Sequence, residues 1–204
     1  MKKIRFIIGL VLAITLTSCA SNKVADSANQ IYTDETAVIK AGKIQNIPIG
    51  KVKKDALKTD SIHVEDSSVA KAVPVSVYQL SLQENTKYNF TLKSHPNGLV
   101  AMDANKKSIM IPTVLLYDED FNIIPNQNLT RKTVAPTNTE NLLFRVTADW
   151  DIKKTGTYYL VIKSDMSSEQ GITLTVWSYG GSFNGSLDIY FKRNPYGRYS
   201  LKIE

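Results

Sequence analysis

The chain has 204 residues, of which 43% are hydrophobic and 22% are charged, and it contains a single cysteine. Its formal net charge of +6 falls to +3 when residues 1–18 are left out, because Lys2, Lys3 and Arg5 lie there without any acid. A charge this small argues against a nucleic-acid partner, and a single cysteine excludes an internal disulfide. The length and apolar content suit one domain with its own hydrophobic core.

An N-terminal signal segment ends at Cys19. The basic residues 1–5 precede an apolar run over 6–16 that is too short for an ordinary membrane-spanning helix. Leu16-Thr17-Ser18-Cys19 resembles the bacterial lipoprotein signal, which implies that residues 1–18 are removed and that Cys19 carries diacylglycerol and palmitate chains. Because no Asp follows Cys19, the resemblance points to the outer membrane, with the protein facing the periplasm. The alternative is an ordinary secretory signal with an incidental cysteine.

Residues 19–60 are expected to form the lipidated N-terminus and a flexible tether, because their polar first half has no sustained period of 2 or 3.6. A few apolar residues within it could form a short strand that docks onto the domain: Ile44, Ile47, Ile49 and Val52. A basic cluster follows, made of Lys51, Lys53, Lys54 and Lys58. It indicates contact with phosphate-bearing envelope polymers or lipid headgroups, or simply a solvated tether kept extended by its charges.

From residue 73 onward, apolar and polar residues alternate as in half-buried β-strands. The alternating residues are Tyr78, Leu80 and Leu82; Tyr88, Phe90 and Leu92; Leu142, Phe144, Val146 and Ala148; Ile172, Leu174 and Val176; Leu187, Ile189 and Phe191; Tyr199, Leu201 and Ile203. Residues 114–117 and 158–162 are apolar on both faces, which predicts central strands with both sides covered.

Turn formers separate these runs, and no helix is expected after the signal. The spacing predicts an all-β domain over residues 61–204, an antiparallel β-sandwich or jelly roll of about eight or nine strands. We expect that domain to fold without the residues before Ser61. Two long loops are predicted, over residues 96–108 and 126–141.

Several of these strands occur in an order that resembles the bacterial pre-peptidase C-terminal domain, a small secreted β-sandwich. The most recognisable pieces are residues 115–118 (LLYD) and 155–161 (TGTYYLV). Residues 112–121 also resemble, more weakly, the maltose operon periplasmic protein family, whose members are exported β proteins. The resemblance covers roughly residues 70–178, implies a fold, and supplies no catalytic residue.

The chain departs from the pre-peptidase C-terminal pattern where some members bind calcium. Residues 72–76 contain no acid before the first core strand, and the turn after residue 118 lacks the usual glycine. Asp118, Glu119 and Asp120 could offer oxygen ligands to a hard cation, but an acidic β-turn is the commoner explanation for them. We therefore assign no metal ligand and no cofactor.

The sequence shows no nucleophile elbow, zinc-protease motif or phosphate-binding glycine loop. His63 and His95 are expected to be surface histidines without a role. A hydrolase would need a cleft that gathers Asp149, Asp151 or Asp165 with His95, and a sequence cannot establish such a cleft. We therefore assign no catalytic residue and expect no enzyme activity.

An aromatic surface is the candidate binding site. Trp177, Tyr179 and Tyr190 alternate opposite to the presumed core residues of their strands, so they could stack on sugar rings or contact a protein. A second buried layer is the alternative. The sequence thus predicts a non-catalytic envelope lipoprotein that binds a polysaccharide or a protein partner. The alternative function is an accessory component, or a divergent member, of an envelope hydrolase.

Overall fold

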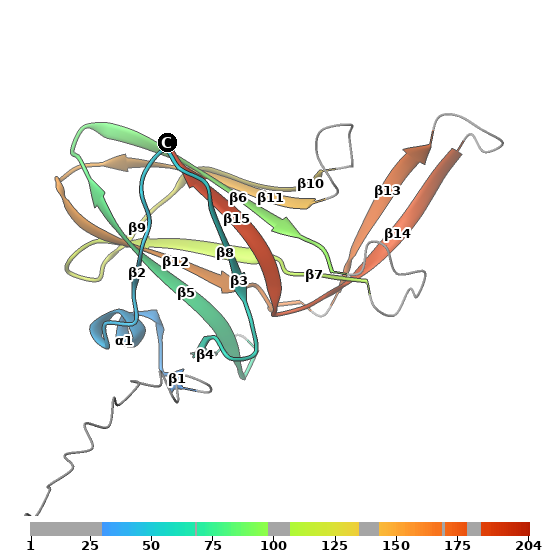
Figure 1. Ribbon diagram of the computed structural model, residues 1–204, viewed down its shortest axis with the longest axis horizontal. Coiled ribbons are helices and arrows are strands. Elements are labelled where there is room, and N and C mark those ends of the chain that lie inside the picture. Colours follow the sequence, from blue (N-terminus) through green and yellow to red (C-terminus); the bar gives the residue numbers. More distant parts are fainter. Residues whose placement is uncertain (1–29, 68, 98–106, 135–142, 169, 179–184) are drawn as a thin grey trace, which may run out of the picture.

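A computed structural model describes residues 30–67, 69–97, 107–134, 143–168, 170–178 and 185–204, and most of these residues lie in β-strands. Two sheets face one another as a β-sandwich, which confirms the predicted fold class (Figure 1). Within the described residues there are fifteen strands and one short helix, so the predicted number of eight or nine strands was too low. Most of the additional strands are short pieces of two to five residues.

The first sheet has the strand order β1-β4-β5-β12-β8-β9, with β2 paired in parallel with β5. Its strands are β1 (Ile31–Tyr32), β2 (Gln45–Asn46), β4 (Ile62–Asp66), β5 (Lys71–Leu82), β8 (Pro112–Tyr117), β9 (Ile123–Ile124) and β12 (Gly156–Ser164). The second sheet has the order β10-β11-β6-β15-β3 and is antiparallel throughout. Its strands are β3 (Lys53–Leu57), β6 (Thr86–His95), β10 (Gln127–Val134), β11 (Leu143–Ile152) and β15 (Gly197–Ile203).

The main hydrophobic core fills the space between the two sheets, as the alternating pattern predicted. In β6, the residues Tyr88, Phe90 and Leu92 are buried and the residues between them point outward. In β11, Trp150 packs edge-to-face on Phe90 with ring centroids 5.8 Å apart, and its indole donates a hydrogen bond to the carbonyl of Ile124. A side-chain period of 2 therefore gives β6 and β11 of the second sheet one core-facing side and one outward side.

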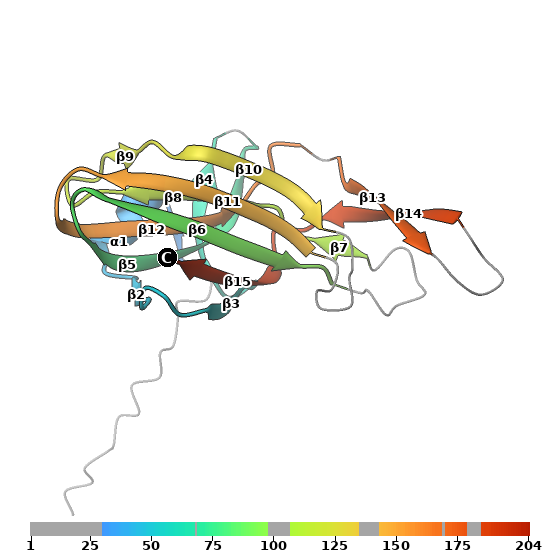
Figure 2. The same cartoon turned by 90° about the horizontal axis from the view of Figure 1, so that it is seen from above.

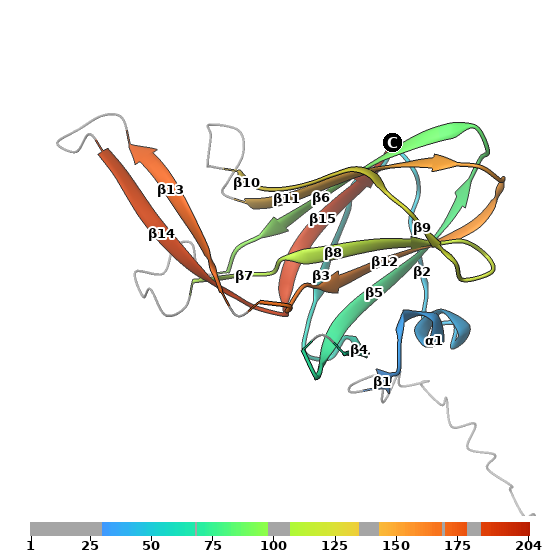
Figure 3. The same cartoon turned by 180° about the vertical axis from the view of Figure 1, so that it is seen from behind.

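A second apolar layer covers the other side of the first sheet. The helix α1 (Glu35–Lys40) contributes Val38 and Ile39, which pack with Val75 and Val77 of β5 and with Val161 of β12. The strand β12 lies between β5 and β8 in this sheet (Figure 3). It is thus buried on both faces, and β8 partly so, as their doubly apolar sequences predicted.

The segment that covers this side of the first sheet is part of the one that the sequence assigned to a tether. Residues 30–60, here called the strap, carry β1, α1, β2 and β3 and pack against the sandwich. Val38, Ile39, Ile47 and Leu57 are all at most 6% exposed. The interpretation of 19–60 as one flexible tether was therefore wrong for the strap. Its buried apolar residues are few and occur singly or as one adjacent pair, so no single period marks them.

Polar contacts hold the strap at both ends. Asp34 caps α1 by accepting a hydrogen bond from the amide of Ala37, and Lys163 of β12 lies 2.8 Å from Glu35. Inside the sandwich, the hydroxyl of Tyr78 donates to Asp55 of β3 at 2.5 Å and lies 2.6 Å from the hydroxyl of Tyr199. Burial raises the pKa of the Tyr78 hydroxyl, so this group stays a neutral donor.

A third, smaller sheet projects from one end of the sandwich (Figures 1 and 2). It consists of the hairpin β13 (Ile172–Ser178) and β14 (Gly185–Arg193), with β7 (Ser108–Ile109) paired in parallel with β14. Ile172 and Ile189 are half-buried against the main core. Among the described residues, no helix is long and apolar enough to cross a membrane.

Candidate functional site

A shallow groove of about 400 Å³ runs over the outward face of the second sheet. It crosses the three adjacent strands β15, β6 and β11. Seven of its nine lining residues are polar or charged, and the full set comprises Val52, Thr91, Lys93, Arg145, Thr147, Ser200, Leu201, Lys202 and Glu204. Because the core-facing residues of these strands are buried, the alternating partners that line the groove are directed outward.

Strand register places four cations in one line across this face, here called the cation row. Lys54 of β3 lies opposite Ser200 of β15, Ser200 lies opposite Lys93 of β6, Lys93 lies opposite Arg145 of β11, and Arg145 lies opposite Lys132 of β10. Directly opposed residues point to the same side of a sheet. The row therefore runs perpendicular to the strands and crosses all five of them.

His95 lies close to several cations at the same end of this face. It lies on β6 opposite Arg198, and its imidazole Nε2 is 3.5 Å from the hydroxyl of Ser200. Burial lowers the pKa of His95, and the nearby cations Arg198, Lys93 and Lys54 lower it further. This half of the face is thus positive, and His95 is half-buried within it rather than a free surface histidine.

A second row, rich in hydroxyl groups, lies beside the cation row. The register places Lys202 opposite Thr91, Thr91 opposite Thr147, and Thr147 opposite Thr130. The hydroxyls of Thr130 and Thr147 are 2.5 Å apart. The face thus presents a line of charge next to a line of groups that can both donate and accept hydrogen bonds.

Two carboxylates of this face, Asp149 and Asp151, lie on β11 at the end away from the cation row, and each has a polar partner. Asp149 forms an ion pair with Lys87 at 2.9 Å and accepts a hydrogen bond from Asn128, and Asp151 accepts one from Gln127 at 2.8 Å. The hydrogen bond from Lys87 is the main cause that holds the pKa of Asp149 below its usual value. A general acid needs a raised pKa, so Asp149 is poorly suited to that role.

The structure does not bring the candidate hydrolase residues together. Asp149 lies opposite Asn89, which is six residues before His95 on β6, or about 20 Å along the strand. Asp165 follows β12 in the other sheet, where it accepts a hydrogen bond from Arg131 at 3.1 Å. No cleft that gathers these acids with His95 is present among the described residues.

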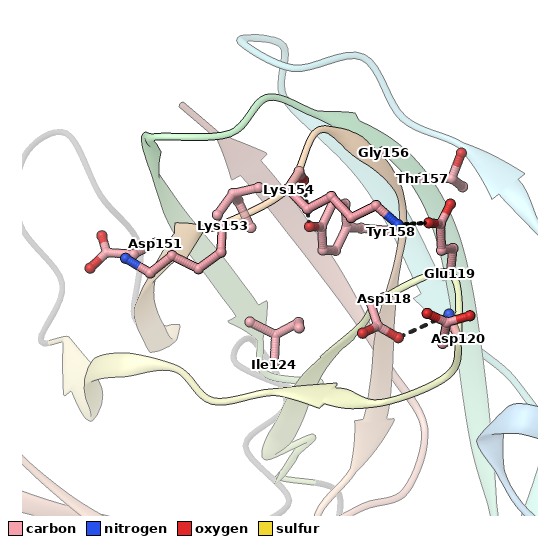
Figure 4. Close-up of a pocket in the computed structure, with 11 residues that line it drawn as sticks. Asp118, Glu119, Asp120, Ile124, Asp151, Lys153, Lys154, Gly156, Thr157 and Tyr158 are labelled. Atoms are coloured by element: carbon pink, nitrogen blue, oxygen red, sulfur yellow. Dashed lines mark hydrogen bonds and ion pairs between the residues drawn. The ribbon is translucent and has the colours of Figure 1, made fainter.

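The acidic turn after β8 borders a cavity of about 150 Å³ at one end of the sandwich (Figure 4). Asp118 accepts hydrogen bonds from the amides of Asp120 and Asn122 and from the Asn122 side chain, so its oxygens close its own turn. Glu119 forms an ion pair with Lys154. No group of three or more potential metal ligands is found in the described part of the chain.

The aromatic surface predicted from the sequence is described only in part. Tyr190 of β14 is 51% exposed, and its hydroxyl accepts a hydrogen bond from the amide of Gly171. Its neighbour Ile189 is half-buried, as the predicted alternation requires. The side chain of Trp177, and Tyr179 altogether, lie outside the described residues, as does Cys19. The three-residue binding surface therefore stays a prediction.

His63 departs from its expected surface position. It lies on β4 opposite Pro74, is 8% exposed, and meets Tyr196 edge-to-face with ring centroids 6.3 Å apart. The sequence placed His63 near a tether, but the strap and β4 are part of the sandwich. Its ring is thus a packing element.

The sequence did not predict the groove or its cation row. Only Lys54 had been singled out, within the basic cluster of residues 51–58. Outward cations on alternating positions are visible in the sequence at Lys93, Arg145 and Lys202. What joins them is the register between strands that are far apart in the chain, and the sequence does not contain that register explicitly.

Comparisons with known proteins identify no family. No family model and no curated protein matches the chain. Among solved structures, one similar fold is the pre-peptidase C-terminal domain of collagenase from Bacillus anthracis, at 13% identity and a TM-score of 0.38, covering 79% of this chain and 94% of that domain. Another is CorA, a surface-associated copper-binding protein of Methylomicrobium album BG8, at 6% identity and a TM-score of 0.38, covering 79% and 96%.

Proposed function

We propose that this chain is a non-catalytic, lipid-anchored envelope protein whose sandwich binds a polysaccharide on the outward face of the second sheet. The observation that carries the proposal is the polar groove over β15, β6 and β11. It is open, it is built on regular strands rather than on loops, and its hydroxyl and cationic groups suit a hydroxyl-rich ligand. In the described part of the chain, no helix or strand packs over it.

The absence of catalysis is part of the proposal and is argued from chemistry. Hydrolysis requires an acid, a base or a nucleophile placed around one bond. Here the pKa of Asp149 is lowered by its partners Lys87 and Asn128, and His95 lies about 20 Å away along β6. Both observations favour a binding role over the alternative of a divergent envelope hydrolase.

The lipid anchor rests on the signal segment that ends at Cys19. Acyl chains contribute about 0.8 kcal/mol for each buried CH₂ group, so two or three chains hold a protein firmly at a bilayer. The proposed location is the periplasmic side of the outer membrane. A protein partner in place of a polysaccharide is the second possibility for the groove, because aromatic-free polar surfaces with charged side chains also occur in protein contacts.

The test is co-sedimentation of the detergent-solubilised full chain with peptidoglycan sacculi, together with affinity electrophoresis in dextran and in polygalacturonate. We expect binding to at least one of these. Ser200→Trp, which fills the groove, should reduce that binding at least tenfold without changing the unfolding midpoint. Ser81→Trp is the matched control, because Ser81 is an exposed serine on the outward side of β5 in the other sheet. No binding to any of the three polymers, or equal loss in both variants, would overturn the proposal.

A further inference from the structure

The cation row indicates which class of polysaccharide the groove accepts. We propose that the ligand is an anionic polysaccharide, with carboxylate or phosphate groups, that lies across the strands along Lys54, Lys93, Arg145 and Lys132. The inference rests on the proposed function and specifies the ligand of the same face. The row meets four of the five strands with a cation, at steps of about 4.8 Å from strand to strand.

The first argument is the placement of like charges. Directly opposed side chains in an antiparallel pair have Cβ atoms about 5 Å apart, and like charges there destabilise a sheet. This chain places Lys93 opposite Arg145 and Arg145 opposite Lys132. An anionic ligand adds an attractive contact to each of these cations, so the arrangement favours the bound state.

The second argument is the separation of charge on the face. The cations gather at one half, where they lower the pKa of His95, while Asp149 pairs with Lys87 and Glu204 pairs with Lys202. A flat bilayer surface would meet both halves at once, including the carboxylates of Asp149, Asp151 and Glu204. A linear polymer can follow the cation row alone, which favours a polysaccharide over lipid headgroups.

The third argument is the line of hydroxyls beside the row. Thr91, Thr147 and Thr130 form a line parallel to the cation row, two residues away from it on each strand. Side-chain hydroxyls donate and accept hydrogen bonds, as sugar hydroxyls do. A chain of acidic sugars lying in the groove can therefore place its charges on the cation row and its hydroxyls on the threonines.

The experiment compares polygalacturonate, which carries a carboxylate on each sugar, with neutral dextran, using the detergent-solubilised full chain. The test variant is Lys54→Gln/Lys132→Gln, because both lysines are exposed and end the row. The control is Lys43→Gln/Lys71→Gln, which removes the same charge from exposed positions outside the second sheet, one in the strap before β2 and one on β5 of the first sheet. We expect polygalacturonate binding that weakens with added salt, and about a tenfold loss in the test variant at low salt.

Three outcomes contradict the proposal and leave the proposed function separately testable. Dextran bound as tightly as polygalacturonate, without salt dependence, would retain the polysaccharide function and exclude the anionic ligand. Equal weakening in the test and control variants would show a general charge effect. Row-dependent binding to phosphatidylglycerol vesicles without binding to polygalacturonate would assign the face to a membrane surface instead.

Discussion

His95 lies where burial and positive charge act on the same imidazole. Its pKa is lowered from 6.5, so the unfolded chain binds this proton more readily than the folded protein does. The folded protein therefore loses stability as the pH falls below about 6.5, until the folded-state pKa is passed. The effect has the opposite sign to that of a histidine stabilised by a carboxylate.

We expect His95→Gln to remove this loss. Denaturant unfolding midpoints of both proteins, measured at about pH 8 and about pH 5, should show a larger acid-induced drop in the wild type. All other titrating groups are common to the two chains and cancel in the comparison. Parallel declines in the two proteins would show that His95 is not held in a positive environment.

Leu160 tests the double burial of the central strand β12. Its side chain is fully buried in the main core, and its neighbour Val161 is buried in the second layer. Leu160→Ala should cost about 2–5 kcal/mol in the free energy of unfolding, through lost burial and the cavity that remains. Leu129→Ala is the control, since Leu129 is 42% exposed, and should stay within about 0.5 kcal/mol. Similar small losses for both variants would contradict the placement of β12.

At the scale of elements, the long alternating strands were predictable and the edges were not. β5, β6, β11 and β12 carry enough apolar residues for period 2 to show. The edge strand β10 lies within a predicted loop, because six of its eight residues are exposed and it carries charges rather than an apolar face. The helix α1 has only six residues, too few for a helical period to emerge.

The candidate site was predicted even less well, because it depends on register. The cations of the row are far apart in sequence, from Lys54 to Arg145, and only strand pairing brings them into line. The sequence did offer an aromatic face on the C-terminal hairpin as one candidate, and the exposed Tyr190 agrees with the predicted alternation. Pairing partners follow from the whole fold, and local composition does not specify them.

The strap gives a prediction about the boundary of the folded unit. A fragment that starts at Ser61 lacks four buried apolar side chains: Val38, Ile39, Ile47 and Leu57. Each contributes about 1.5–3 kcal/mol when buried, and their sum is comparable with the net stability of an average domain. We therefore expect that fragment to unfold at much lower denaturant than a fragment that starts at Gln30, if it folds at all. Equal midpoints would show that the strap is dispensable, as the sequence had suggested.

For the whole molecule, the anchor is the decisive prediction. Cys19→Ser should release the protein from membranes or leave its signal uncleaved, because the thioether to lipid cannot form. Cell fractionation and the electrophoretic mobility of the protein measure both outcomes. A processed Cys19→Ser protein that remained with the membrane fraction would contradict the lipoprotein proposal.

The packed strap also limits how far an anchored domain can travel. If all of residues 20–60 were extended, the chain would reach about 140 Å from the lipid. Residues 20–29 lie between Cys19 and residue 30, where the described structure begins, and ten residues span at most about 35 Å. In a lipidated form, residue 30 of the sandwich would thus stay within about 35 Å of the lipid. A polymer that binds the second sheet would have to come that close to the bilayer.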